Sequence, residues 1–519
     1  MLYGDWGTSK AYVIGLAFVA AGYSSFPIIL AVCALTGIVG FNYIIVCRHF
    51  PDGGGVYSSA RSQSRLLAVT GALLLVADLT VTAALSGWSA MSYFDVPKAH
   101  IAFATVGLVL GVGIINYFGP KHSGSVAISL AIPMVLVVLM IIGLSVPYLS
   151  LAHLEATHDN FSKNWVAFVG VILALSGVEA IANLTGVLKL DSGATMEEPK
   201  IARSATKSIV VVAVEVVAGT ALLGWAMLSL PKELQPKLVE RWEDMLRFLA
   251  EQYGAMAWGN SFGHIFGIIV GIVVGMLLLS AVNTAIGALI GLLYMVACDG
   301  EMPRSFIRLN SHGVPWIPLL IATVLPMLVL LVARSLESLA NLYAIGVVGA
   351  ITLNLGSCTI NKTLGLKVWE RIVMGGTFLI LVAVEITIAK TKPDALFFAV
   401  CIMGFGLGLR AYGQRRAGLR TVTVSEEVAA HVSPGPLPTL KLNLTPRPVD
   451  HGRRPWHYAR VEVRDGGNVV EARDVLRSFC ERAGGEFAGS VGGDGPSALA
   501  GRSEGGANHV RNAGTRRAE

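Results

Sequence analysis

Apolar segments of membrane-spanning length recur along the first four-fifths of this 519-residue chain. The hydrocarbon core of a bilayer is about 30 Å thick, and a helix of roughly 20 apolar residues crosses it. Hydrophobic residues make up 54% of the chain and charged residues 14%, whereas soluble domains carry roughly 25% charged residues. The chain is therefore predicted to be an all-α integral membrane protein.

A window about nineteen residues wide predicts twelve transmembrane helices. They cover residues 7–22, 24–47, 66–93, 100–118, 123–145, 165–188, 208–229, 264–296, 316–333, 338–360, 370–389 and 394–411. Lys and Arg are more frequent in the connections on one side of these helices. The positive-inside rule then predicts both termini in the cytoplasm and a multi-pass location in the inner or plasma membrane.

Composition divides the chain into three parts. Residues 1–411 are predicted to form the transmembrane domain. Residues 412–485 are predicted to form a small cytoplasmic tail, in which "YARVEVRDGGNVVEARDVLRSFCERAGG" suggests a partial α/β element of one strand and one helix. Residues 486–519, rich in Gly, Ser, Ala and Arg, are predicted to be disordered.

An amphipathic segment, "PKLVERWEDMLRFLAEQYG", separates two of the predicted spans. It places Leu238, Trp242, Met245, Leu246 and Leu249 on one helical face and charged residues on the other. Such a helix is expected to lie along the outer membrane surface. A cap over an external vestibule and an inert interfacial helix are the two alternatives.

Charged side chains inside the predicted spans are few. At the bilayer centre each costs from about 2.5 to more than 10 kcal/mol, so such residues commonly mark function. Asp5 and Lys10 lie in the segment that opens the first span, and Asp78, Glu179, Glu215 and Glu385 lie inside later spans.

Two predicted spans contain glycine beside polar residues. The first begins with "GDWGTS", which includes Gly4 and Gly7, and the sixth contains "LSGVE", which includes Ser176, Gly177 and Glu179. Secondary transporters built from inverted repeats carry broken helices at corresponding positions of the two repeats, and the freed carbonyls and helix ends coordinate ions. We therefore expect helix breaks at Gly4 and Gly7 and at Gly177.

Longer motifs extend this comparison to a family. "FPDGGGVYSSAR", "SGVEAIANL", "EEPKIARSATKS" and "SAVNTAIGALIGLLYMVACDGEMPRSF" resemble segments of the amino acid, polyamine and organocation (APC) transporter superfamily. The resemblance runs from the first predicted span to about residue 411. It implies a LeuT-like fold with a 5+5 inverted repeat. A bundle of the first, second, sixth and seventh spans would rock against the remaining helices.

The first span has a more specific resemblance. "GDWGTSKAY" is similar to the Gly-Asp-Ile-Gly-Thr-Ser-Pro-Leu-Tyr signature of KUP potassium transporters, and its acid-to-tyrosine spacing matches the KimA-type potassium importers. This resemblance implies that Asp5 and Tyr12 bind a cation. Seven residues of straight helix rise about 10 Å, so the two side chains share one ion only if the helix bends, which Gly7 permits.

The KimA-type resemblance implies further site residues. Thr82 and Ser86 in "DLTVTAALS", Ser176 in the sixth span and Tyr343 in "LANLYAIGVVGAITLN" are its implied cation ligands, and Glu179 its implied proton-coupling residue. Hydroxyl and carboxylate oxygens suit a weakly hydrated monovalent cation. Hydrogen bonding to neighbouring helices is the structural alternative for these Thr and Ser side chains.

The function predicted from these motifs is proton-coupled uptake of K⁺. The alternative is a proton-coupled amino-acid or polyamine permease of the same fold, although an anionic Asp5 would repel a substrate carboxylate. A membrane sensor that signals through the tail would need a folded tail. We expect no enzyme activity, because the sequence has no His cluster, nucleophile motif or phosphate loop.

The predicted partners follow from this function. They are the lipid bilayer and a small ion or small-molecule substrate, with no nucleic acid, and the sequence leaves a homodimer open. No cofactor is expected besides the transported K⁺ and H⁺, and no metal site besides the proposed K⁺ site.

The start of the chain differs from the KUP pattern in two ways. Lys10 stands where KUP members have proline, which leaves open a buried ion pair between Lys10 and Asp5. Only four residues precede Asp5, so the half-helix expected before the break is missing. Upstream sequence is expected to encode about 12 to 20 further apolar residues, enough to cross half of the hydrocarbon core.

The role assigned to Glu179 is testable through pH. Glu179→Gln is expected to abolish the pH dependence of uptake between pH 5.5 and 8, because an amide cannot titrate. Uptake is measured across this range in the variant and the parent protein. Identical pH profiles would show that Glu179 is structural.

Overall fold

The computed structural model describes residues 3–50, 55–61, 63–119, 123–155, 160–172, 182, 191, 201–417, 441–446 and 457–462, and describes side chains in the first helix from Lys10 onward. The chain divides into two compact units, residues 1–410 and 411–519.

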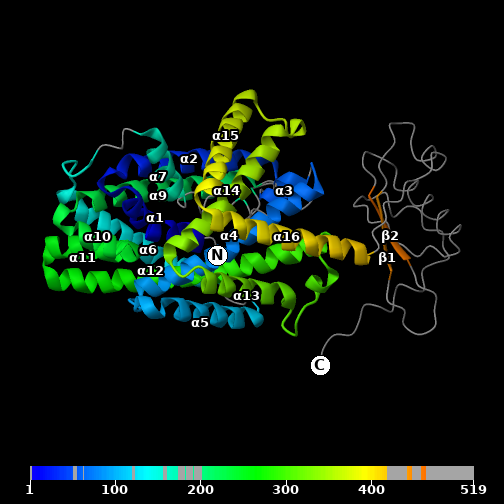
Figure 1. Ribbon diagram of the computed structural model, residues 1–519, viewed down its shortest axis with the longest axis horizontal. Helices are drawn as coiled ribbons and strands as arrows, with labels where there is room; N and C mark the ends of the chain where they lie inside the picture. Colours follow the sequence, from blue (N-terminus) through cyan, green and yellow to red (C-terminus); the bar gives the residue numbers. More distant parts are fainter. Residues whose placement is uncertain are drawn as a thin grey trace. The chain divides into compact units, whose positions relative to one another are not determined.

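Helices build the first unit (Figure 1). The longer helices are α1 (Tyr3–Ala21), α2 (Phe26–His49), α3 (Val56–Arg61), α4 (Arg65–Tyr93), α5 (Lys98–Tyr117), α6 (Ser123–Ser145), α7 (Phe161–Val171), α9 (Ala202–Ser229), α10 (Gln235–Glu240), α11 (Met245–Trp258), α12 (Asn260–Cys298), α13 (Trp316–Val332), α14 (Leu336–Ile360), α15 (Val368–Thr391) and α16 (Pro393–Ala417). The short 3₁₀ turns are η1 (Gly22–Ser24), η2 (Val146–Tyr148), η5 (Lys232–Leu234), η6 (Trp242–Asp244), η7 (Arg304–Ile307) and η8 (Lys362–Leu364).

Nine helices within the described residues are long and apolar enough to cross a membrane. Two more apolar helices, Lys10–Ser24 and Trp316–Val332, are shorter. The predicted span 165–188 lies mostly outside the described residues. The near all-helical membrane architecture is thus confirmed, while the count of twelve spans and the inverted repeat stay predictions.

Local sequence signals set several helix boundaries. Ser64 caps α4, where its hydroxyl accepts a hydrogen bond from the Leu67 amide, and Ser335 caps α14 in the same way through the Ser338 amide. A hydroxyl at this position satisfies one of the amides that a helix N-terminus leaves unpaired. Gly259, at a φ of 91°, makes the sharp turn between α11 and α12.

The expected break at Gly4 and Gly7 is not present in this backbone. Both glycines lie inside α1, which runs as one α-helix from Tyr3 to Ala21. A glycine inside a helix costs only about 1 kcal/mol, less than the several kcal/mol of an unsatisfied backbone group in lipid. The helix is interrupted only at Gly22, whose φ is 54°.

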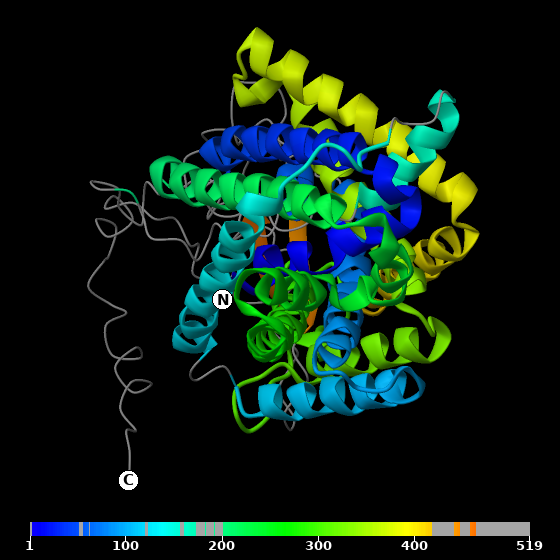
Figure 2. The ribbon, with the colours of Figure 1, turned by 90° about the vertical axis from the view of Figure 1, so that its left-hand side faces the viewer.

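The first unit contains two groups of closely packed helices. α2 packs mainly on α9 and also contacts α7, and α1 packs against α7 and α9 as well as against α12 of the second group. In the second group, α4 packs mainly on α12 and α14, and α5 packs on α13. Figure 2 shows α2 and α9 side by side, with α15 alongside α2. The first group contains the described members of the bundle that the APC resemblance implies.

The amphipathic segment 235–253 packs on protein. It forms α10, η6 and most of α11, which contact α1 and α12, and η6 also contacts α4. Leu238, Met245, Leu246 and Leu249 are fully buried in this contact. Its apolar face therefore covers other helices, which corrects the expectation that this face lies on the membrane surface.

Besides the last turns of α16, the described part of the second unit is one antiparallel pair of strands. β1 (Lys441–Pro446) pairs with β2 (His457–Glu462), with Lys441 opposite Glu462. β2 lies where the sequence predicts a strand, whereas β1 was not predicted. The predicted tail helix lies outside the described residues.

The contact between α1 and η6 yields a stability prediction. A Cβ added at Gly15 would overlap the backbone carbonyl oxygen of Trp242, whereas one added at Gly37 would meet nothing within 4 Å. Gly15→Ala is expected to lower stability by about 1–3 kcal/mol, because backbone atoms cannot yield as a side chain can. Thermal melting in detergent checks this against Gly37→Ala. Equal melting temperatures would contradict the contact.

Candidate functional site

A polar face runs along α4 in the middle of the first unit. Asp78, Thr82, Ser86, Ser89 and Tyr93 follow one another at spacings of three or four residues, so they lie on one side of the helix. All five are buried. We refer to these five residues as the α4 polar face.

Within the part of the chain that the structure describes, two hydroxyl groups of this face have no hydrogen-bond partner. The oxygens of Ser86 and Ser89 are fully buried and unbonded. Thr82 instead donates to the backbone carbonyl of Asp78 at 2.8 Å. A buried polar group without a partner carries a desolvation penalty of about 1–3 kcal/mol. Ser86 and Ser89 therefore offer oxygen atoms that the fold itself does not use.

Helix α14 packs closely against this face. A Cβ at Gly346 would lie 2.8 Å from the Asp78 amide nitrogen, and one at Gly349 would lie 3.3 Å from Leu74. The two helices are antiparallel, because higher residue numbers on α14 face lower ones on α4. The same register places Thr82 at the level of Tyr343, which is buried on α14. Two predicted site residues thus lie at the same level of one helix pair.

Helix α1 reaches the α4 polar face at its end. The Tyr93 hydroxyl donates to the carbonyl of Ala11 at 2.7 Å and accepts from the Leu246 amide at 3.3 Å. Tyr12, the next residue of α1, is buried. Tyr93 therefore joins α1, α4 and α11 beside a predicted cation ligand.

Lys10 forms its ion pair with Glu215 of α9. The Lys10 side chain is completely buried, and the Glu215 side chain is 22% exposed. The contact of Lys10 that the structure defines is thus with α9. The sequence left open a pair with Asp5, although residues five apart point about 140° apart on an α-helix.

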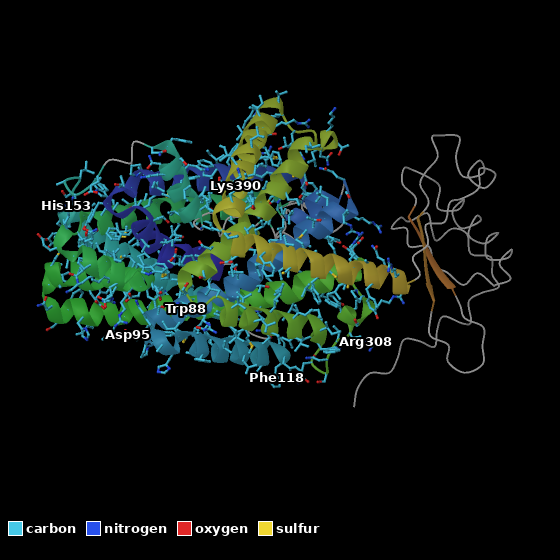
Figure 3. The ribbon with its side chains drawn as sticks, viewed as in Figure 1. Trp88, Asp95, Phe118, His153, Arg308 and Lys390 are labelled. Carbon is cyan, nitrogen blue, oxygen red and sulfur yellow. The ribbon has the colours of Figure 1, made fainter. Side chains whose placement is uncertain are left out.

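Polar contacts hold the α10–α11 segment over the end of α4. Trp88 and Ser92 donate to the Glu243 carboxylate at 3.3 and 2.9 Å, and Arg247 pairs with Asp95 at 3.1 Å. Figure 3 marks Trp88 and Asp95 near this end, with Arg308 toward the other. The α4 polar face is closed at the end marked by Tyr93.

The centre of this segment is a buried ion-pair cluster. Arg241 contacts the carboxylates of Asp244 and Glu251, and Arg247 also contacts Glu251 at 3.2 Å. Burial raises the pKa of the Asp244 carboxyl above its usual value, although Arg241 opposes this shift. The cluster matches the cap alternative for this segment better than an inert interfacial helix.

A second polar cluster lies where α4 begins. Tyr57 and Arg61 of α3 donate to Asp299 at 2.7 and 2.8 Å, and Arg410 donates to Glu301 at 2.6 Å. Burial, followed by the bond to Asp299, raises the pKa of Tyr57 above its usual value. These contacts join α3, α16 and the C-terminal end of α12 around the start of α4.

The remaining predicted site residues are described only in part or not at all. Gly4, Asp5 and Gly7 lie on the described backbone of α1, but the side chain of Asp5 lies outside the described part. Ser176, Gly177 and Glu179 lie outside the described residues. Their proposed roles stay predictions.

The sequence reasoning missed Ser89 as a site residue. Ser89 follows Ser86 by three residues, a spacing visible in the sequence. Asp78 lies well inside α4 and is buried. Among the described residues, no group of three His, Cys, Asp or Glu side chains could hold a metal ion.

Comparison with known families gives one match over most of the chain. A family model described as amino acid permease matches residues 3–405. No curated protein matches the sequence. The matched range begins in α1 and ends in α16, so it contains the α4 polar face, the Lys10–Glu215 pair and the α10–α11 segment.

The bonding of the α4 polar face predicts a contrast in stability. Replacing Ser86 and Ser89 together by Ala is expected to leave the melting temperature unchanged or higher, because two unpaired buried hydroxyls are removed. Tyr93→Phe is expected to destabilise by about 1 kcal/mol, because its hydroxyl makes two hydrogen bonds. Thermal melting in detergent measures both. A large loss in the double Ala variant would contradict this account.

Proposed function

The chain belongs to the amino acid permease family, and from this premise we propose that it is a secondary-active transporter that takes up K⁺ together with protons. The family supports a membrane transporter with a small substrate. The choice of K⁺ and of protons is our proposal.

The observation that carries the proposal is the pair of buried, unbonded hydroxyl oxygens of Ser86 and Ser89. They share a helix face with Thr82 and with the carboxylate of Asp78. Oxygen atoms in a buried site can bind K⁺ by replacing its hydration shell. A nearby carboxylate compensates the ionic charge.

The proposed ligands come from several segments. Asp5 and Tyr12 of α1, Thr82 and Ser86 of α4, and Tyr343 of α14 are five of them. Ser176 is a sixth, and Glu179 is the group proposed to carry the coupled proton. Helix α4 contacts α1 at Tyr93 and α14 at Asp78, so it is the helix through which this grouping is connected.

Alternating access would move one helix group against the other. In the proposed cycle α1, α2 and α9 move with the segment 165–188 against α4, α12 and α14. The ligands on α1 and those on α4 and α14 belong to different groups. Relative movement would therefore open and close the site.

A proton-coupled amino-acid or polyamine permease is the second candidate. The description of the matching family favours it. In that case the hydroxyls of Ser86 and Ser89 would bind polar groups of an organic substrate. The two candidates share the fold and the proton coupling, and they differ in the substrate.

Uptake into proteoliposomes separates the two candidates. The purified protein is expected to take up ⁸⁶Rb⁺, a tracer for K⁺, when a proton gradient is imposed, and unlabelled K⁺ should compete. Labelled amino acids and polyamines are tested in parallel. Uptake of an organic substrate without Rb⁺ uptake would overturn the proposal in favour of the second candidate.

Two variants test the ligand assignment. Asp5→Asn is expected nearly to abolish Rb⁺ uptake without changing expression, because the amide keeps the shape and loses the charge. The double Ser86→Ala, Ser89→Ala variant is expected to raise the KM for Rb⁺ about tenfold, which corresponds to the loss of about 1.4 kcal/mol of binding. Uptake within twofold of the parent protein in either variant would remove that residue or pair from the site.

A further inference from the structure

The Lys10–Glu215 pair lies on the side of α1 that faces away from the proposed ligands. Successive residues of an α-helix turn by about 100°, so positions 5 and 12 share a face and position 10 points about 140–160° away from it. Lys10 meets α9 on that opposite side. The ion pair is therefore positioned to orient α1 from behind.

Helix α9 has a space shaped for the lysine. Gly219 lies four residues after Glu215, on the same face of α9. A Cβ at Gly219 would lie only 2.8 Å from Cδ of Lys10. The lysine stem thus passes α9 at Gly219, where any larger residue would displace the stem. Its ammonium group pairs with Glu215.

The opposite side of α1 is held by backbone contacts. The Ala11 carbonyl accepts from Tyr93, and Gly15 lies against the backbone of Trp242. These contacts bring α1 close to α4 and η6. These contacts and the ion pair on the other side of α1 can all form at only one rotation of α1 about its axis.

We propose that the Lys10–Glu215 ion pair is a pin that sets the rotation of α1 on α9, so that the face of α1 with positions 5 and 12 points away from α9. Both residues are positioning residues in this proposal. The inference deepens the proposed function and rests on it, because the positions held in place are the proposed cation ligands. The pin stays closed throughout transport, since α1 and α9 belong to the same moving group.

An ion pair suits this role better than apolar contacts. Lipid tails are as apolar as Leu, so apolar packing alone gives little preference for one rotation of a membrane helix. Separating two buried charges is strongly unfavourable. The pair therefore penalises any rotation of α1 that withdraws Lys10 from Glu215.

The central test replaces both charges at once. A single substitution leaves one buried charge uncompensated and can prevent folding, whereas an apolar pair of similar size is commonly tolerated. Lys10→Met with Glu215→Leu is expected to fold and to raise the KM for Rb⁺ at least tenfold with Vmax within threefold of the parent. The charge swap Lys10→Glu with Glu215→Lys is expected to restore the KM to within threefold.

Two further variants separate the pin from general packing. Gly219→Ala is expected to raise the KM as the double variant does, because its Cβ displaces the lysine stem. Gly37→Ala, on α2 with open space around it, is the matched control and is expected to behave as the parent.

The outcomes distinguish this inference from the proposed function. A KM within twofold of the parent in the double apolar variant would overturn the pin. Absence of Rb⁺ uptake by the parent protein would overturn the proposed function instead. In that case the rate at which maleimide labels Tyr12→Cys tests the pin. This rate is expected to rise at least threefold when Lys10→Met and Glu215→Leu are also present. An unchanged rate would refute the pin.

Discussion

The cost of an uncompensated charge in the membrane governs how this protein arranges its polar groups. An ionised side chain removed from water needs an opposite charge or several hydrogen bonds close by. Lys10 meets Glu215 between two helices, and Arg48 of α2 pairs with the buried Glu370 of α15 at 3.0 Å. These contacts join helices that are far apart in the sequence. They thus determine which helices can be neighbours.

Small residues allow the close approach that such polar contacts require. Gly346 lets α14 pack against the backbone of α4, Gly219 leaves space for Lys10 beside α9, and Gly15 lets η6 approach α1 closely. Small residues are favoured at membrane helix contacts because the backbones can then approach closely. The α4 polar face owes its burial to this packing, since α14 covers it at Gly346. The glycines therefore place the polar groups without contacting any substrate.

The sequence predicted most helices and fewer of their contacts. Apolar length located α4, α6 and α14 to within two residues at each end, because a bilayer fixes how long a span must be. The pairing of Lys10 could not be predicted, since it depends on which face of α1 meets α9. The break at Gly4 and Gly7 was wrong for this backbone, because glycine permits a bend without requiring one.

The candidate site was likewise predicted only in part from the sequence. Thr82, Ser86 and Tyr343 came from family motifs, and packing places Thr82 and Tyr343 at one level of the α4–α14 contact. Ser89 and the role of Tyr93 in joining three helices follow from burial and bonding, which no local pattern reports. The lining of the site contributed by the segment around Ser176 stays a prediction.

The arrangement of charge supplies the physical reason for preferring K⁺. An amino acid brings a carboxylate as well as an ammonium group, and the carboxylate needs a cation or several amide donors in a buried site. Lys10, the lysine nearest the proposed ligands on α1, already neutralises Glu215 on the opposite face. The α4 polar face offers hydroxyl oxygens and the carboxyl of Asp78, a group that would repel a second carboxylate if ionised. A dehydrated K⁺ needs only oxygen atoms and one compensating negative charge, and this face is built of such groups.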